Sequence, residues 1–360
     1  MIKIFRAKNY GCLTGIEAHL TPVHAFIGPN DSGKSTILRG LRTVSHLTLG
    51  KFERIDGDLW APFDPGIEEN GTTRAGDIPG SFLECVVDGG SYAVTLRRGT
   101  VTEALESKSS KVEFRRTWDD DGIFRHSETI AVEPVLGQLR SALMLRFDPD
   151  ALRAASGLIP DSQSTGFLND RGSGLPGVYF ALRNRGDDAF NAVVEATRKH
   201  FPTIKTLRLK AVTTNTLELE IELLNGVRVS ARRMSEGLLY FLAFAAIRHI
   251  DPPSLLLVEE PENGLHPARI REVVRMLRVI AEEMGTQVVM ATHSPLVVNE
   301  LKPEEVTVVT RPSLEEGTKL TPIKETHNFE KRSSVYALGE LWLSYADGEF
   351  ENPLIKGPDA

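Results

Sequence analysis

A glycine-rich segment near the amino terminus has the residues needed to bind a triphosphate. Residues 28–36 read Gly-Pro-Asn-Asp-Ser-Gly-Lys-Ser-Thr, which fills the pattern G-x-x-x-x-G-K-[ST]. Such a turn ahead of a helix aims backbone N–H groups and the helix N-terminus at one point, where an anion can bind. The Lys34 ammonium would reach the β- and γ-phosphates, and the Ser35 hydroxyl would be a ligand of Mg²⁺. The residues expected to contact the nucleotide are Gly28, Asn30, Asp31, Ser32, Gly33, Lys34, Ser35 and Thr36.

The segments on either side support this interpretation over an ordinary surface turn. The apolar run Val23–Ile27 predicts a buried strand, and a helix is expected to begin near Thr36. A phosphate-binding loop needs this strand–turn–helix context. The sequence therefore predicts a nucleoside triphosphate site here.

Two adjacent carboxylates follow another predicted buried strand. The run 254–258 is continuously apolar and ends in Glu259 and Glu260. Carboxylates in such a place are costly to bury unless they have a role. In phosphate-loop ATPases one acid at this position holds Mg²⁺ and another orients the attacking water. We assign Glu259 to the metal and Glu260 to the water; the alternative is an acidic strand end that faces solvent.

His293 follows a third predicted strand, over 287–291. At the end of a buried strand it could donate a hydrogen bond to the γ-phosphate, although a lone histidine is more often an ordinary loop residue. Ser235 precedes an almost unbroken apolar run over 238–247 and is predicted to cap a helix. A helix start with a small hydroxyl can also bind a phosphate supplied by another subunit.

Together these motifs resemble those of the ABC-type ATPases, above all the soluble branch that contains RecF, SMC-type proteins and OLD-family ATPases. The resemblance covers residues 1–50 and 225–300, and the stretch 259–267 looks especially like the stand-alone AAA-domain ATPases of the OLD type. It implies an α/β P-loop NTPase fold of the ABC type, with a mixed sheet flanked by helices, an antiparallel β sub-domain and an inserted helical lobe.

The resemblance also implies a catalytic role for Glu260, His293 and Lys34, with ATP and Mg²⁺ as cofactors. Ser235 and Gly237 would form the signature that completes a partner's ATP site, so a homodimer with sandwiched ATP is expected. Glu259 replaces the aspartate usual in the family. Glu236 follows Ser235 where transporters have glycine, which disfavours an importer subunit.

The middle of the chain is expected to form the sub-domains. Hairpins are predicted around the turns Asp88–Gly90 and Asn225–Gly226, and residues 150–210 are expected to be helical, with breaks at three prolines. The predicted division is 1–149 and 216–360 for the two parts of the ATPase lobe and 150–215 for the helical insert. In this family a glutamine between the lobes senses the γ-phosphate, and Gln163 is one candidate for it.

The amino-acid composition limits the classes of protein to which this chain can belong. The 360 residues are 41% hydrophobic and 25% charged, with a net charge of −7 and two cysteines. These values fit a soluble protein of the reducing cytoplasm, without a disulfide framework. No leader or membrane-spanning run is expected.

Two functions of different classes remain open. One is an ATPase of DNA repair or anti-phage defence; because only 67 residues follow His293 (360 − 293), any nuclease that it controls is expected to be a separate chain. The other is a nucleotide-dependent switch that holds a partner protein or toxin without touching DNA. The net negative charge does not favour DNA, so binding would need local basic clusters. The candidates are Arg97, Arg98, Arg198, Lys199, His200, Lys205, Arg208, Lys210, Arg228, Arg232 and Arg233.

Overall fold

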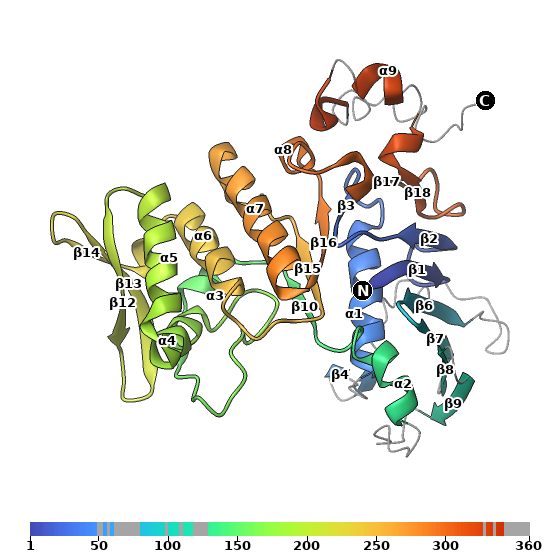
Figure 1. Ribbon diagram of the computed structural model, residues 1–360, viewed down its shortest axis with the longest axis horizontal. Coiled ribbons are helices and arrows are strands. Elements are labelled where there is room, and N and C mark those ends of the chain that lie inside the picture. The colour runs from blue at the N-terminus through green and yellow to red at the C-terminus, as the bar shows by residue number, and fades with distance from the viewer. Residues whose placement is uncertain are drawn as a thin grey trace. The chain divides into compact units, whose positions relative to one another are not determined.

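The computed structural model describes residues 1–48, 53–55, 58–60, 80–97, 100–107, 111–117, 129–326, 329–333 and 336–341. The chain divides into two compact units (Figure 1). The first unit comprises residues 1–143, 253–259 and 286–360, and the second comprises 144–252 and 260–285. The predicted insert 150–215 lies within the second unit, which also takes in the segment with Ser235.

A mixed six-stranded sheet forms the centre of the first unit, in the order β10-β15-β16-β3-β17-β18. The strands β15, β16, β3 and β17 are mutually parallel and buried along their whole length, whereas β18 is antiparallel. The bounds are β3 Val23–Ile27, β10 Ala142–Leu145, β15 Leu255–Glu259, β16 Gln287–Thr292, β17 Val306–Thr310 and β18 Lys319–Pro322. The three buried strands expected from the apolar runs are confirmed.

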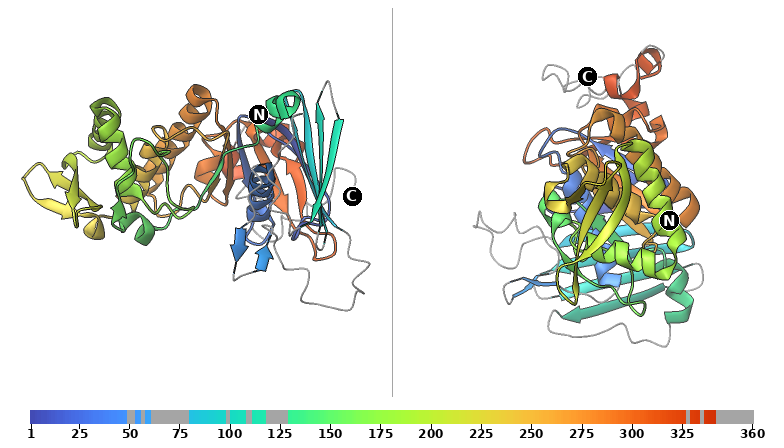
Figure 2. Two further views of the ribbon diagram at one scale, coloured as in Figure 1. Left: turned by 90° about the horizontal axis from the view of Figure 1, so that it is seen from below. Right: turned by 90° about the vertical axis from the view of Figure 1, so that its left-hand side faces the viewer.

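A second, antiparallel sheet completes the first unit, in the order β2-β1-β6-β7-β8-β9. Helix α1 (Lys34–Thr48) contacts β6 of this sheet as well as β15 and β16 of the mixed sheet (Figure 2). The strands are β1 Ile2–Lys8, β2 Ile16–His19, β6 Ser81–Val87, β7 Gly90–Arg97, β8 Thr100–Ser107 and β9 Lys111–Thr117. The pairing of β6 with β7 confirms the first predicted hairpin. The expected mixed sheet, helices and antiparallel sub-domain are thus all present.

The first unit also contains several shorter elements. They are β4 Glu53–Ile55, β5 Asp58–Trp60, α2 Thr129–Leu136, α8 Pro295–Val298 and α9 Phe329–Ser333, with 3-10 turns at Pro303–Glu305 and Ile323–Glu325. Within the described part of the chain, no helix combines the length and apolar character needed to cross a membrane.

The second unit consists of helices and a small antiparallel sheet. Helix α6 (Glu236–Ile247) is buried from Leu238 to its end and contacts α3, α4, α5 and α7. The other elements are α3 Pro149–Arg153, β11 Ser156–Gly157, α4 Leu175–Arg185, α5 Asp187–His200, β12 Ile204–Ala211, β13 Thr216–Leu223, β14 Arg228–Ser230, a 3-10 turn Ala231–Arg233 and α7 Pro267–Met284. The pairing of β13 with β14 confirms the second predicted hairpin.

The helical prediction for 150–210 is wrong over 154–174, which contains no helix, and over 204–210, where the chain forms β12. This segment pairs with the regularly alternating β13, which supplies a ladder partner that local propensity cannot reveal. The predicted break at Pro176 is also wrong, because this proline lies in the first turn of α4. Proline fits that position since its missing N–H has no intrahelical partner there.

A buried histidine in β3 makes the stability of the fold dependent on pH. The His24 side chain is 1% exposed, and its nitrogens share hydrogen bonds with Thr21 Oγ1 (3.2 Å) and Thr307 Oγ1 (3.1 Å). Burial lowers the pKa of His24 from 6.5 to about 4, although the carboxylate of Glu305 opposes the shift. The folded protein therefore keeps this ring neutral at pH values where the unfolded chain protonates it.

We predict that acid destabilises the protein partly through His24. Since the unfolded histidine gains its proton near pH 6.5 and the folded one near pH 4, the free energy of unfolding falls across that window, by about 3 kcal/mol in total. His24→Gln should lose this dependence in denaturant titrations between pH 7 and pH 5. The exposed His19 supplies a control, and His19→Gln should keep the wild-type slope. Equal slopes in all three proteins would contradict the assignment.

Candidate functional site

The loop over residues 28–33 joins β3 to α1 in the geometry of a phosphate-binding turn. Lys34 is the first residue of α1, and its Nζ donates hydrogen bonds to the carbonyl oxygens of Gly28 (2.8 Å) and Pro29 (2.6 Å). Asp31 and Gly33 have positive φ angles, of 64° and 106°. The loop thus curls around the lysine ammonium, directly before the N-terminus of a 15-residue helix.

Two glycines in this loop are required by the close approach of neighbouring atoms. A Cβ on Gly28 would lie 2.1 Å from the carbonyl oxygen of Val309 at the end of β17. A Cβ on Gly33 would lie 2.3 Å from Oγ1 of Thr318, which donates a hydrogen bond to the carbonyl of Ser32 (2.8 Å). The segment from β17 to β18 therefore packs directly against the loop.

Glu259 and His293 lie at the same edge of the sheet as this loop. Glu259 is the last residue of β15 and pairs in register with Ala291, while Thr292 pairs with Ile27. The carboxyl ends of three adjacent parallel strands thus lead into Glu259, His293 and residue 28. Glu259 is 6% exposed, whereas His293 is exposed. The structure brings together the groups that the sequence placed on three distant segments.

The residues at this edge fit the predicted magnesium ion. Ser35 Oγ and the buried Glu259 carboxylate are hard oxygen donors, the type that Mg²⁺ prefers. In the part of the chain that the structure describes, no group of three or more His, Cys, Asp or Glu side chains could hold a metal. A magnesium ion here would therefore take its remaining ligands from nucleotide and water, as is usual for this ion.

Glu260 has an uncommon backbone conformation. Its φ is +48°, in the left-handed region that side chains other than glycine, asparagine and aspartate rarely adopt. It opens a turn in which the N–H of Asn263 donates to its carbonyl oxygen (2.9 Å). Strained residues of this kind concentrate at functional sites, and the catalytic role of Glu260 stays a prediction.

Ser235 occupies the N-cap position of α6, but its side chain makes no capping hydrogen bond. The expected capping interaction is therefore wrong, because the residue has cap backbone angles but an exposed side chain. In the same unit, a Cβ added to Gly237 would lie 3.4 Å from the carbonyl oxygen of Gly264. The turn that follows Glu260 and the start of α6 are thus neighbours.

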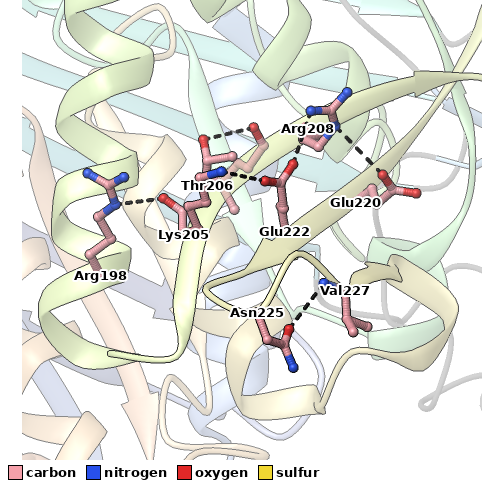
Figure 3. A network of polar contacts seen from close by, with 9 residues as sticks. Arg198, Lys205, Thr206, Arg208, Glu220, Glu222, Asn225 and Val227 are labelled. Carbon is pink, nitrogen blue, oxygen red and sulfur yellow. Dashed lines mark hydrogen bonds and ion pairs between the residues drawn. The ribbon is translucent and has the colours of Figure 1, made fainter.

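Several residues of the predicted basic clusters form ion pairs with acids. In the sheet of the second unit, Lys205 pairs with Glu222 (2.8 Å), and Arg208 pairs with Glu222 (3.2 Å) and Glu220 (3.8 Å) (Figure 3). Lys205 and Arg208 hold the pKa of Glu222 below its usual value, which keeps these pairs charged at neutral pH. Arg198 pairs with Glu195 (2.6 Å). The side chain of Arg97 and all of Arg98 lie outside the described residues.

The structure does not test the predicted role of Gln163. It also places two residues beside the phosphate loop that the sequence analysis did not include. Gln163 lies exposed in a loop of the second unit, where its carbonyl accepts from Arg185 (2.8 Å), so its predicted role stays untested. Thr318 and Arg311, both beside the phosphate loop, were not foreseen. The apolar run 306–309 could have indicated them, since it is a further parallel strand that ends at the same edge.

Comparison with known proteins agrees with this architecture. The family profile described as "AAA domain, putative AbiEii toxin, Type IV TA system" matches residues 23–299. The OLD nuclease of Thermus scotoductus is 22% identical over an alignment of 340 positions, which covers 82% of this chain. This chain spans only 59% of that relative's length.

Solved structures of Smc heads show the same fold. An Smc head bound to the C-winged helix domain of ScpA superposes with a TM-score of 0.60 at 15% identity, over 89% of this chain and 97% of that one. A Pyrococcus furiosus Smc head with an extended coiled coil, bound to the C-terminal domain of ScpA, gives a TM-score of 0.52 at 13% identity, over 93% and 98%. The ABC-type fold expected from the motifs is thereby confirmed.

We predict that Gly28→Ala disrupts the phosphate loop. The added methyl would collide with the Val309 carbonyl, so the loop must move off β17, at a cost of about 1–3 kcal/mol in the free energy of unfolding. Isothermal titration calorimetry with ATP and Mg²⁺ should show at least about tenfold weaker binding. Gly15→Ala is a matched control, because a Cβ at Gly15 meets nothing within 4 Å. Wild-type affinity in Gly28→Ala would show that this close approach does not shape the site.

Proposed function

This chain belongs to the AAA domain family described above and is an ABC-type ATPase of the RecF, SMC and OLD branch, and on that basis we propose that it works as a dimeric, ATP-driven switch. The observation that supports this most strongly is the shared sheet edge. There the phosphate loop, Glu259 and His293 follow three adjacent parallel strands. The proposal places the protein in the cytoplasm, where its two cysteines would stay reduced.

In this proposal, the phosphate loop binds the triphosphate. The N–H groups of residues 28–36 and the start of α1 receive the phosphates, and Lys34 exchanges its bonds to the Gly28 and Pro29 carbonyls for phosphate oxygens. Magnesium, held by Ser35 and Glu259, would neutralise charge on the phosphates. Glu260 orients the attacking water, and His293 donates a hydrogen bond to the γ-phosphate.

The signature residues would act on the nucleotide of a second copy. Ser235 is exposed, its hydroxyl is not used in capping, and it stands at the N-terminus of the 12-residue helix α6. Such a helix start favours an anion. Two copies would form an isologous dimer in which Ser235 and Gly237 of each complete the site of the other. ATP binding then closes the dimer and hydrolysis releases it.

Two kinds of partner fit the proposed switch. The relative from Thermus scotoductus is named a nuclease, which favours a role in DNA repair or anti-phage defence, with DNA or a separate nuclease as partner. The Smc heads were solved with domains of ScpA bound, which favours a protein partner. The compensated charges of Lys205 and Arg208 favour the second candidate function, a switch that holds an effector protein without DNA contact.

Glu260→Gln should separate ATP binding from hydrolysis. The amide keeps the shape of the side chain but cannot act as a base, so we expect turnover to fall at least about 100-fold. Calorimetry should show retained ATP affinity, and light scattering should show a dimer that persists with ATP. Lys34→Ala is the contrasting variant and should lose binding itself. Turnover of Glu260→Gln at the wild-type rate would remove Glu260 from the catalytic role.

Ser235→Arg should block closure without affecting nucleotide binding. The bulky cation at the α6 N-terminus would exclude the partner's γ-phosphate, because it fills the approach to the helix start. We expect wild-type affinity for ATP and a monomer at all ATP concentrations in the Glu260→Gln background. An ATP-dependent dimer formed by the double variant would argue against the signature role.

If DNA is the partner, adding DNA should change the rate of ATP hydrolysis. If the switch engages DNA, linear duplex should stimulate steady-state hydrolysis, and the stimulation should weaken as salt rises. The blank is Glu260→Gln with the same DNA. A hydrolysis rate that stays the same when DNA is added would favour the protein-partner function. The search for the partner would then turn to co-purifying proteins.

A further inference from the structure

An arginine that the family motifs do not include lies beside the phosphate loop. Arg311 directly follows β17, the parallel neighbour of β3, and its Nη1 lies 3.4 Å from Oδ2 of Asp31. Asp31 stands near the middle of the loop in a left-handed conformation, with φ of 64°. The ion pair therefore joins the phosphate loop to the neighbouring strand.

Arg311 and Asp31 differ in how far they are buried. The Arg311 side chain is 20% exposed, and its Nε is buried without a hydrogen-bond partner in the part of the chain that the structure describes. The Asp31 side chain, in contrast, is 90% exposed. The ion pair thus joins a mostly buried guanidinium to an exposed carboxylate of the loop.

A second contact from the same segment reaches the next residue of the loop, Ser32. Thr318, just before β18, donates a hydrogen bond from Oγ1 to the Ser32 carbonyl (2.8 Å). The β17–β18 connection therefore contacts two consecutive loop residues, Asp31 and Ser32, from one side.

Asp31 creates an electrostatic problem for a site that binds a polyphosphate. A carboxylate within the loop repels the anion for which the loop's N–H groups are arranged, and at short range this repulsion weakens binding substantially. A guanidinium that pairs with the carboxylate offsets its negative charge and so reduces that repulsion.

We propose that Arg311 is a positioning residue of the nucleotide site, which neutralises Asp31 and sets the conformation of the phosphate loop for an incoming triphosphate. This inference rests on the proposed function, because it presumes that the loop binds ATP. It deepens that function by adding a group outside the known motifs. Arg311 acts through Asp31 and does not itself touch the phosphates.

A double-mutant cycle tests the coupling. The full-length wild type, Arg311→Gln, Asp31→Asn and the double variant are titrated by calorimetry with magnesium and a non-hydrolysable ATP analogue, then with ADP and with adenosine. Lys324→Gln serves as a matched control, because it removes a cation that pairs with Glu304 (3.2 Å) and both side chains are half exposed. Thermal unfolding of every variant verifies folding.

Arg311→Gln should weaken binding of the ATP analogue about tenfold and binding of ADP by less, and it should leave binding of adenosine unchanged. The reason is that the unpaired Asp31 carboxylate repels each ligand in proportion to the negative charge of that ligand. Asp31→Asn should restore binding in the Arg311→Gln background to within about twofold of the wild type, since it removes the charge that needed a partner. Lys324→Gln should bind as the wild type does.

Other outcomes overturn the proposal in distinguishable ways. A double variant as weak as Arg311→Gln would mean that Arg311 contacts phosphate directly or serves the fold, and the proposed function would survive. An equal loss for all three ligands would likewise mean a structural role. Wild-type protein that binds none of the nucleotides would overturn both this inference and the proposed function.

Discussion

The parallel pairing of β3 with β16 and β17 is the constraint on which the candidate site depends. In a parallel sheet all strands point the same way, so the residues that follow them gather at one edge. The register aligns Thr292 with Ile27 and Val308 with Ile27, so the loop after β16 starts level with the phosphate loop, and β17 runs two residues further before Arg311. Residues that are far apart in the sequence thereby come together, because these apolar strands pair side by side in one sheet and are buried along their whole length.

The same pairing imposes a steric demand on the loop that it positions. Since β17 runs beside β3, its Val309 carbonyl approaches Gly28 so closely that no side chain fits there. Oγ1 of Thr318 likewise leaves no room for a side chain at Gly33. Glycine at these positions is usually explained by the approach of phosphate. Here the protein's own neighbouring hairpin already requires it, which makes the loop a packed part of the sheet before any nucleotide arrives.

The sequence allowed the sheet edge to be predicted but not everything that surrounds it. Buried parallel strands are continuous apolar runs, so Val23–Ile27 and Leu255–Glu259 were recognisable, and the glycine turn and Glu259 could be placed at their ends. The strand over 204–211 was missed because its partner, β13, decides its conformation. Arg311 was missed for a related reason, since only the tertiary pairing of β17 with β3 places it next to Asp31. Local patterns thus identify groups that follow a strand but not groups that become neighbours across strands.

The distribution of charge in the second unit limits how a polyanion could bind. Lys205 and Arg208 are committed to Glu222 and Glu220, and a phosphate backbone would have to displace those acids. Among the predicted basic residues, Arg232 and Arg233 are exposed and lie in the 3-10 turn just before Ser235. A bound polyanion that used them would lie at the start of α6, where the proposed signature acts. Binding of DNA and closure on ATP would then draw on the same helix end, so each would change the affinity for the other.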